Sequence, residues 1–120
     1  MMLLLAQVLA ALVLLIHVYI FALETVLFKD RGRKVFGLSR EQAQAMASAM
    51  SNQGCYNGFL ALALALGFLL PDATTARAFT VYGLVCVCIA GIWGGVTVQR
   101  RILLVQTLPA ALALAALWAA

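Results

Sequence analysis

Four long apolar stretches alternate with short polar segments along this chain. They cover about residues 3–28, 50–70, 78–98 and 102–120. Each stretch has about the 20 residues that an α-helix needs to cross the hydrocarbon core of a bilayer. The pattern therefore predicts an all-α polytopic membrane protein, folded as a bundle of four transmembrane helices.

Local signals set the ends of these helices. Ser39 with Gln42 three residues later is a capping-box pattern, so we expect the second helix to start in the cytoplasm near Arg40 and to continue unbroken into its span. The Pro-Asp pair at 71–72 ends this helix, and Gln-Arg-Arg at 99–101 predicts a tight turn. The first stretch lacks the basic region and the cleavage site of a secretory signal, so we expect it to stay in the mature protein.

The composition narrows the class of protein further. Hydrophobic residues make up 66% of the 120 residues and charged residues only 10%, and the mean hydropathy is +1.07. Four spans leave roughly 40 residues for all connections. We therefore expect residues 1–120 to form a single transmembrane domain, which excludes a separate soluble catalytic domain, a nucleotide-binding sheet and binding to nucleic acid.

Lysine and arginine residues are unevenly distributed over the connections. The first and third connections hold Lys29, Arg31, Arg33, Lys34, Arg40, Arg100 and Arg101. The second connection, residues 71–77, holds only Arg77. By the positive-inside rule, this connection and both termini should lie outside the cytoplasm. An anionic-lipid or partner patch is the alternative interpretation of the first basic cluster, although topology alone explains it.

Two ionisable residues of the first helix are candidates for function. Glu24 and His17 lie within the apolar stretch, where an ionisable side chain costs about 2.5–3.5 kcal/mol on insertion scales. They are seven residues apart, which places them on one helical face but about 10 Å apart along the axis. We therefore expect no direct hydrogen bond between them without a bridging water or a third residue.

The second helix supplies amide side chains near the same depth. Counting inward from the end of the helix places Asn52 and Gln53 at the cytoplasmic boundary, and Asn57 about 9 Å inside, level with Glu24. Gln53 and Asn57 are also neighbours on one helical face. This stretch therefore predicts a polar surface within the cytoplasmic half of the membrane.

Counting along the third and fourth helices reaches a similar depth. Trp93 and Thr97 in the third and Gln106 in the fourth fall near this layer, and Pro109 should free a backbone carbonyl about four residues earlier. The layer predicts a polar intramembrane pocket. The candidate ligand-binding residues are Glu24, His17, Asn52, Gln53, Asn57, Tyr56, Trp93 and Gln106.

Each candidate also has a purely structural interpretation. Asparagine and glutamine in membrane spans often only join helices, with hydrogen bonds worth about 0.6–2 kcal/mol. Glu24 can be a neutral structural carboxyl that binds an amide, and His17 can donate to a backbone carbonyl. The aromatic residues Tyr56, Trp93 and Tyr19 are common in packing and at membrane interfaces.

Two glycine pairs indicate close helix packing. Gly54 and Gly58 form a GxxxG pair in the second helix, and Gly91 and Gly95 form one in the third. Such pairs let two helix backbones approach closely. We expect the second pair to serve packing or to form a homodimer face.

The cysteines and the single histidine give no sign of a metal or redox centre. Cys86 and Cys88 point about 160° apart on a helix, so they fit neither a chelate nor a local disulfide. With Cys55 they are best interpreted as small packing residues. We expect no metal site, no haem and no other cofactor.

Together, the sequence IHVYIFALETVLF at 16–28, the sequence NQGCYNG at 52–58 with the Phe-Leu-Ala that follows, and the chain length resemble one known family. It consists of bacterial inner-membrane proteins of about this length and is classified only as a domain of unknown function. The resemblance covers nearly the whole chain. It implies four membrane helices in the inner membrane, and it implies no established activity.

Three functions fit this pattern. In the first, Glu24 and the amides hold the polar end of an amphipathic ligand such as a lipid, isoprenoid or quinone, for binding or transport in the lipid bilayer. In the second, Glu24 and His17 are general acid and base in a membrane-embedded isomerase or cyclase. In the third, the protein is a scaffold or accessory subunit. We favour ligand binding.

Overall fold

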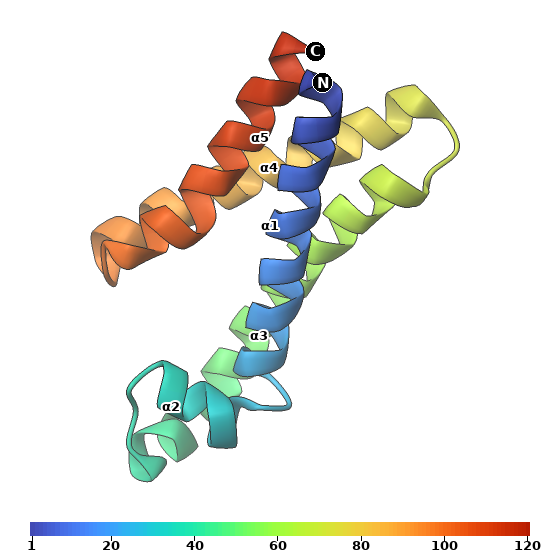
Figure 1. Cartoon of the computed structure of the whole chain (residues 1–120). Helices are drawn as coiled ribbons and strands as arrows, with labels where there is room; N and C mark the ends of the chain where they lie inside the picture. Colours follow the sequence, from blue (N-terminus) through green and yellow to red (C-terminus); the bar gives the residue numbers. More distant parts are fainter. The chain divides into compact units, whose positions relative to one another are not determined.

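A computed structural model describes all of residues 1–120 and shows an all-α protein without strands. The elements are α1 (Met2–Glu24), the π-helix η1 (Phe28–Gly32), α2 (Arg33–Val35), α3 (Arg40–Leu69), α4 (Ala73–Thr97), the π-helix η2 (Leu103–Thr107) and α5 (Leu108–Ala119) (Figure 1). They form two compact units. Unit 1 comprises residues 1–15 and 60–120, and unit 2 comprises residues 16–59. The all-α prediction is confirmed.

Two of these helices have the length and composition to cross a membrane. They are α1, of 23 residues, and α4, of 25 residues. The stretch Leu103–Ala119 is a shorter apolar helix. α3 is longer, at 30 residues, but its N-terminal half is rich in polar side chains. Many apolar side chains of α1 and α4 are exposed, as expected for helices that face lipid.

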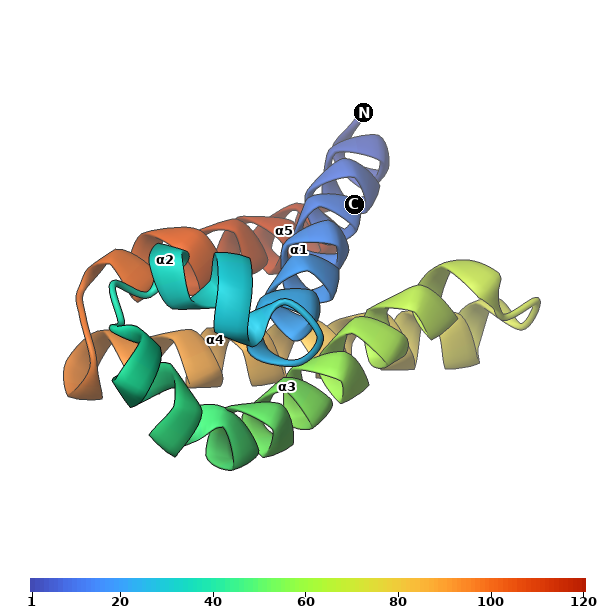
Figure 2. The same cartoon turned by 90° about the horizontal axis from the view of Figure 1, so that it is seen from below.

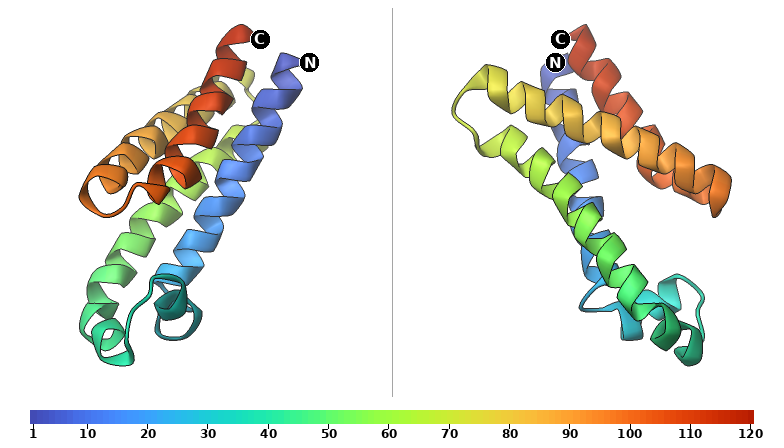
Figure 3. Two further views of the ribbon diagram at one scale, coloured as in Figure 1. Left: turned by 60° about the vertical axis from the view of Figure 1, so that its left-hand side comes forward. Right: turned by 180° about the vertical axis from the view of Figure 1, so that it is seen from behind.

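Unit 1 has an apolar core to which α1, α3, α4 and α5 all contribute. Its buried residues are Val13, Leu64, Leu84, Val87, Ala110 and Ala113. A second cluster of Ala6, Ala116 and Leu117 lies near the chain ends, which are close together in Figures 1 and 3. α4 and α5 run antiparallel and side by side (Figure 3). The many alanines at these contacts allow the helices to pack closely.

The glycines of α4 face the segment that follows the turn. A Cβ atom at Gly91 would lie 2.8 Å from the backbone nitrogen of Thr107, and one at Gly95 would overlap the side chain of Leu103. Both glycines are buried within the single chain. Of the two uses predicted for this pair, packing within the chain is the one that the structure shows, and η2 covers the surface proposed for a homodimer.

The predicted fourth helix begins with a wide, π-helical turn. The backbone N–H of Leu108 donates to the carbonyl of Leu103, five residues earlier. Pro109 follows directly and has no N–H to donate, so the usual hydrogen bond to residue 105 is missing. Thr107 Oγ1 donates to the Cys88 carbonyl at 3.1 Å and joins this turn to α4.

The N-terminus of α3 agrees closely with its sequence signal. The backbone N–H of Ser39 donates to Gln42 Oε1 at 2.9 Å. In return, the backbone N–H of Gln42 donates to Ser39 Oγ at 3.1 Å. This is the reciprocal capping box that the spacing predicts. The helix bounds Arg40–Leu69 also agree with the expected start near 40 and end near 70.

Asp72 caps the N-terminus of α4. Its Oδ2 accepts from the Thr75 hydroxyl at 2.6 Å and from the Thr75 backbone N–H at 2.8 Å. These two hydrogen bonds favour the carboxylate form and lower the pKa of Asp72 below its usual value. Pro71 precedes this cap and cannot continue α3.

The lowered pKa of Asp72 predicts a simple pH dependence. Because the folded value is depressed, the contribution of Asp72 to stability is present above the unfolded pKa, about 3.9, and is lost as the pH falls through the folded pKa. In an NMR titration of the Asp72 carboxyl carbon, we expect a midpoint below this value. Thr75→Val, which removes the hydroxyl donor, should raise the midpoint. An unchanged midpoint in this variant would contradict the assignment.

α1 ends at Glu24, four residues before the predicted limit at Phe28. The Thr25 hydroxyl donates to the Phe21 carbonyl at 2.6 Å, a bond that often bends helices. The Leu27 N–H then reaches back to the Ala22 carbonyl, five residues earlier, at 2.9 Å. The helix therefore unwinds through a wide turn into η1 instead of running straight to the charged segment (Figure 2).

Candidate functional site

Unit 2 contains every buried polar or charged side chain of the protein. There are three: His17 is 0% exposed, and Glu24 and Asn57 are each 7% exposed. All three belong to the set predicted from the sequence. A buried polar group in an apolar helix is costly unless it is hydrogen-bonded, so their concentration in one unit identifies the candidate site.

Glu24 and Asn57 are joined by a direct hydrogen bond. Asn57 Nδ2 donates to Glu24 Oε2 at 2.8 Å, from α3 to the last residue of α1. The contact places the two residues at one level, as counting along the helices predicts. It uses one of the two carboxyl oxygens and one N–H of the amide, so Glu24 Oε1 and the Asn57 carbonyl remain as further hydrogen-bonding atoms.

Two glycines bring the helices close enough for this bond. A Cβ atom at Gly54 would lie 2.6 Å from Thr25 Cγ2 and 3.1 Å from Glu24 Cβ. One at Gly58 would lie 3.1 Å from the ring of Phe21. The pair flanks Asn57 on α3, so the GxxxG spacing places the short asparagine side chain within reach of the carboxyl.

His17 is a second polar position on α1 near this pair. It lies seven residues before Glu24, about 10 Å along the helix axis, and is completely enclosed by the protein. A group that touches both His17 and Glu24 must therefore be about two helical turns long. The separation suits an extended ligand better than a direct proton exchange between the two side chains.

The other predicted residues make no hydrogen bond to the Glu24–Asn57 pair. Asn52 and Gln53 are exposed on α3. Tyr56 is 60% exposed and packs edge-on against Phe59, with the ring centroids 5.8 Å apart.

Trp93 and Gln106 belong to unit 1. Trp93 is 72% exposed, and its carbonyl accepts from the Thr97 hydroxyl at 2.7 Å. Gln106 is half-buried, and its Cβ lies against Gly91. Counting residues from helix ends gives the depth of a side chain but not the direction in which it points, which is why the predicted layer is broader than the contact found.

Each unit also has a cavity, and none of the predicted site residues lines either of them. Unit 1 has a groove of about 330 Å³, lined mainly by apolar residues and by Gln7, Arg77 and Thr80. The Arg77 guanidinium also donates to the Leu117 carbonyl at 3.4 Å. Unit 2 has a larger hollow of about 790 Å³ in the segment 29–44. The apolar pattern of the sequence gives no sign of this groove, although Gln7 is a polar residue within the first apolar stretch.

The side chains that could bind a metal are dispersed. No three histidine, cysteine, aspartate or glutamate residues come together as a metal-binding group. The three cysteines are free thiols. The chemistry available in the candidate site is therefore that of one carboxyl, one amide and one imidazole.

Sequence comparison matches nearly the whole chain to one family. A sequence profile described as "Protein of unknown function (DUF1304)" matches residues 11–118. The matched region includes His17, Glu24 and Asn57. Neither the curated proteins nor the solved structures gave a match.

Proposed function

This chain belongs to the DUF1304 family of proteins of unknown function, and we propose that it binds or transports a small amphipathic or lipid-like ligand inside the membrane. In this proposal, Glu24 and Asn57 hold the polar end of the ligand in the cytoplasmic half of the bilayer. A lipid, an isoprenoid or a quinone has the required combination of a polar end and an apolar tail.

The hydrogen bond between the buried Glu24 and Asn57 side chains carries this proposal. A protein that only needed to pack two helices could use apolar or small residues at this position, at a lower cost in hydrocarbon. The pair keeps Glu24 Oε1 and the Asn57 carbonyl for a ligand, so a hydroxyl, amide or protonated headgroup can bind without breaking the existing bond.

We further propose four membrane spans, with both termini outside the cytoplasm. The apolar helices α1 and α4 support this arrangement, as do the apolar C-terminal half of α3 and the stretch Leu103–Ala119. Seven basic residues in two connections against one in the third favour one orientation. The inner membrane is the expected location.

Reporter fusions test this topology. Alkaline phosphatase, which is active only outside the cytoplasm, should be active when fused after Ala120 or after Asp72, and inactive after Gly37. A fluorescent protein that folds in the cytoplasm should show the opposite pattern. Phosphatase activity after Gly37, or its absence after Ala120, would contradict the proposed orientation.

The identity of the bound molecule is tested by native mass spectrometry of protein gently extracted from its own membrane. We expect the wild type to retain a discrete small molecule and Asn57→Ala to lose about four-fifths of it or more, since one buried hydrogen-bonding contact is worth about 1–3 kcal/mol, a factor of about five or more. Glu24→Gln should show a comparable loss if the ligand binds the carboxyl. Gln99→Ala, which removes an amide from an exposed turn, is the control and should retain the ligand.

The other variants distinguish the competing explanations. Loss of the molecule in Arg77→Gln but not in Asn57→Ala would move the ligand to the unit 1 groove and contradict the proposed site. If the wild type and all variants carried only bulk phospholipid, with the same lipid composition, the result would favour a scaffold or accessory subunit. A bound molecule that is chemically converted by the wild type, but not by Glu24→Gln or His17→Gln, would favour the isomerase or cyclase.

A further inference from the structure

The charged segment after α1 folds around an open hollow, and most of its charged side chains are exposed there. The hollow has a volume of about 790 Å³ and lies entirely within unit 2. Five basic side chains line it: Lys29, Arg31, Arg33, Lys34 and Arg40. Asp30 is its only acidic lining residue. The positive-inside rule accounts for the number of these charges, but it does not require that they converge on one space.

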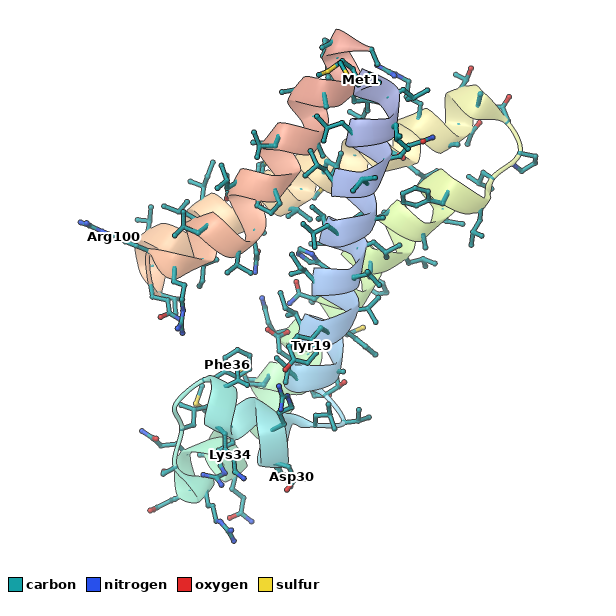
Figure 4. The ribbon with its side chains drawn as sticks, viewed as in Figure 1. Met1, Tyr19, Asp30, Lys34, Phe36 and Arg100 are labelled. Carbon is teal, nitrogen blue, oxygen red and sulfur yellow. The ribbon has the colours of Figure 1, made fainter.

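The guanidinium group of Arg31 is held in place by α1. Arg31 Nε donates to the hydroxyl of Tyr19 at 2.6 Å, and its guanidinium carbon lies 5.7 Å from the centre of the Tyr19 ring. This contact uses one of the five N–H donors of the side chain. The terminal NH₂ groups of Arg31 remain available, and the contact with Tyr19 restrains their orientation. Figure 4 shows Tyr19 near the end of α1, with Asp30 and Lys34 in the charged segment that follows.

Arg33 is also restrained and keeps an unused donor. Its Nη1 donates to the Leu38 carbonyl at 3.3 Å. Its Nε is enclosed by the protein and has no hydrogen-bond partner. Because this atom is enclosed, a ligand in the hollow would contact Arg33 through the second terminal NH₂ group, which makes no hydrogen bond to the protein.

We propose that this basic hollow binds the phosphate group of an anionic glycerol phosphate ester, supplied by a phospholipid of the cytoplasmic leaflet. Arginine pairs bidentately with phosphate oxygens, and clusters of four to eight basic residues next to a membrane helix bind anionic lipids. The hollow follows directly after α1, at the level where headgroups lie if α1 spans the membrane. The same phosphate chemistry occurs in soluble glycerol phosphates, so the source requires a test.

The test compares lipid binding to purified full-length protein in nanodiscs. Native mass spectrometry measures retained phosphatidylglycerol against phosphatidylcholine. We expect at least about tenfold preference for phosphatidylglycerol in the wild type, and its loss in the double variant Arg31→Gln/Arg33→Gln. The matched control is Arg100→Gln/Arg101→Gln, which removes two positive charges from the other connection on the proposed cytoplasmic side. The two double variants therefore change the positive-inside signal by the same amount. The control should keep the preference.

Two further variants keep the test informative if the glutamine variant folds poorly. Tyr19→Phe removes the Arg31 contact without changing any charge, and should weaken the preference by about threefold. Arg31→Lys/Arg33→Lys retains the charge but loses the planar fork, and should weaken it similarly. The proposal would be overturned if Arg31→Gln/Arg33→Gln and the control Arg100→Gln/Arg101→Gln lost the preference for phosphatidylglycerol equally. It would also be overturned if Tyr19→Phe and Arg31→Lys/Arg33→Lys both kept the full preference.

A separate arm identifies the source of the phosphate. Glycerol 3-phosphate is titrated into the protein in phosphatidylcholine nanodiscs and followed by ³¹P NMR. We expect weak binding, at least about tenfold weaker than that of the lipid phosphate, since the soluble ester lacks the membrane anchor. Tight binding of glycerol 3-phosphate without enrichment of phosphatidylglycerol would reject the lipid as the source.

Discussion

Gly32→Ala is expected to destabilise unit 2 more than any other single substitution proposed for this chain. The added methyl group would overlap the backbone carbonyl oxygen of Leu23, and it would also lie 3.3 Å from the Leu27 carbonyl. Neither neighbour is a flexible side chain, so η1 would have to move away from the end of α1. Overpacking against rigid atoms typically costs about 1–3 kcal/mol, and we expect a cost at the upper end of this range.

The effect is measured by titrating SDS into detergent-solubilised protein and following the loss of helicity by circular dichroism. Gly37→Ala is the matched control. Gly37 has a positive φ of 70°, but an added methyl group there would meet no atom within 4 Å, so only backbone strain of roughly 1 kcal/mol is expected. If Gly32→Ala were no more destabilising than Gly37→Ala, this result would contradict the close contact between Gly32 of η1 and Leu23 of α1.

Asn57→Leu is expected to have the second largest effect on stability. Leucine fills similar space but leaves the Glu24 carboxyl without the donor that now lies 2.8 Å away. A buried polar group that loses its partner costs about 1–3 kcal/mol. Glu24→Gln should cost much less, because its amide oxygen can still accept from Asn57 Nδ2 while its size is unchanged.

A double-mutant cycle separates this bond from general packing. The free energy of unfolding is measured for Asn57→Leu, Glu24→Leu and the double variant. We expect the loss of stability in the double variant to be smaller than the sum of the two single losses by about 1 kcal/mol or more, since the double variant removes both polar groups together. Strictly additive losses would show that Glu24 and Asn57 do not interact in the folded protein.

The helix ends show how far local sequence signals reach. The start of α3 follows from Ser39 and Gln42, whose side chains form the predicted box within four residues of chain. The end of α1 does not follow from its apolar pattern, because Thr25 and the contact of Gly32 with Leu23 decide it. That contact joins residues across a folded turn, and a hydrophobicity pattern contains no information about it.

The candidate site also combines features that the sequence predicts with features that only the structure shows. The depth of Asn57 relative to Glu24 could be predicted, because residue counts along a regular helix give the rise. The exposure of Asn52 and Tyr56 could not, since polar and small residues surround them on all sides of α3 and give little sign of which face meets α1. The basic residues at 29–34 were explained by topology, and only the fold shows that they converge on a hollow.

Solid-state NMR of Glu24 and Asn57 in bilayers tests the central claim most directly. The chain has two glutamates and two asparagines, so labelling these residue types also labels Glu41 and Asn52 as internal controls on exposed positions. Spectra are compared in bilayers of lipids extracted from the native membrane and in bilayers of pure synthetic phosphatidylcholine. We predict that the Glu24 carboxyl and Asn57 side-chain amide signals differ between the two, while those of Glu41 and Asn52 stay the same. Identical Glu24 and Asn57 signals in both bilayers would contradict ligand binding at this site.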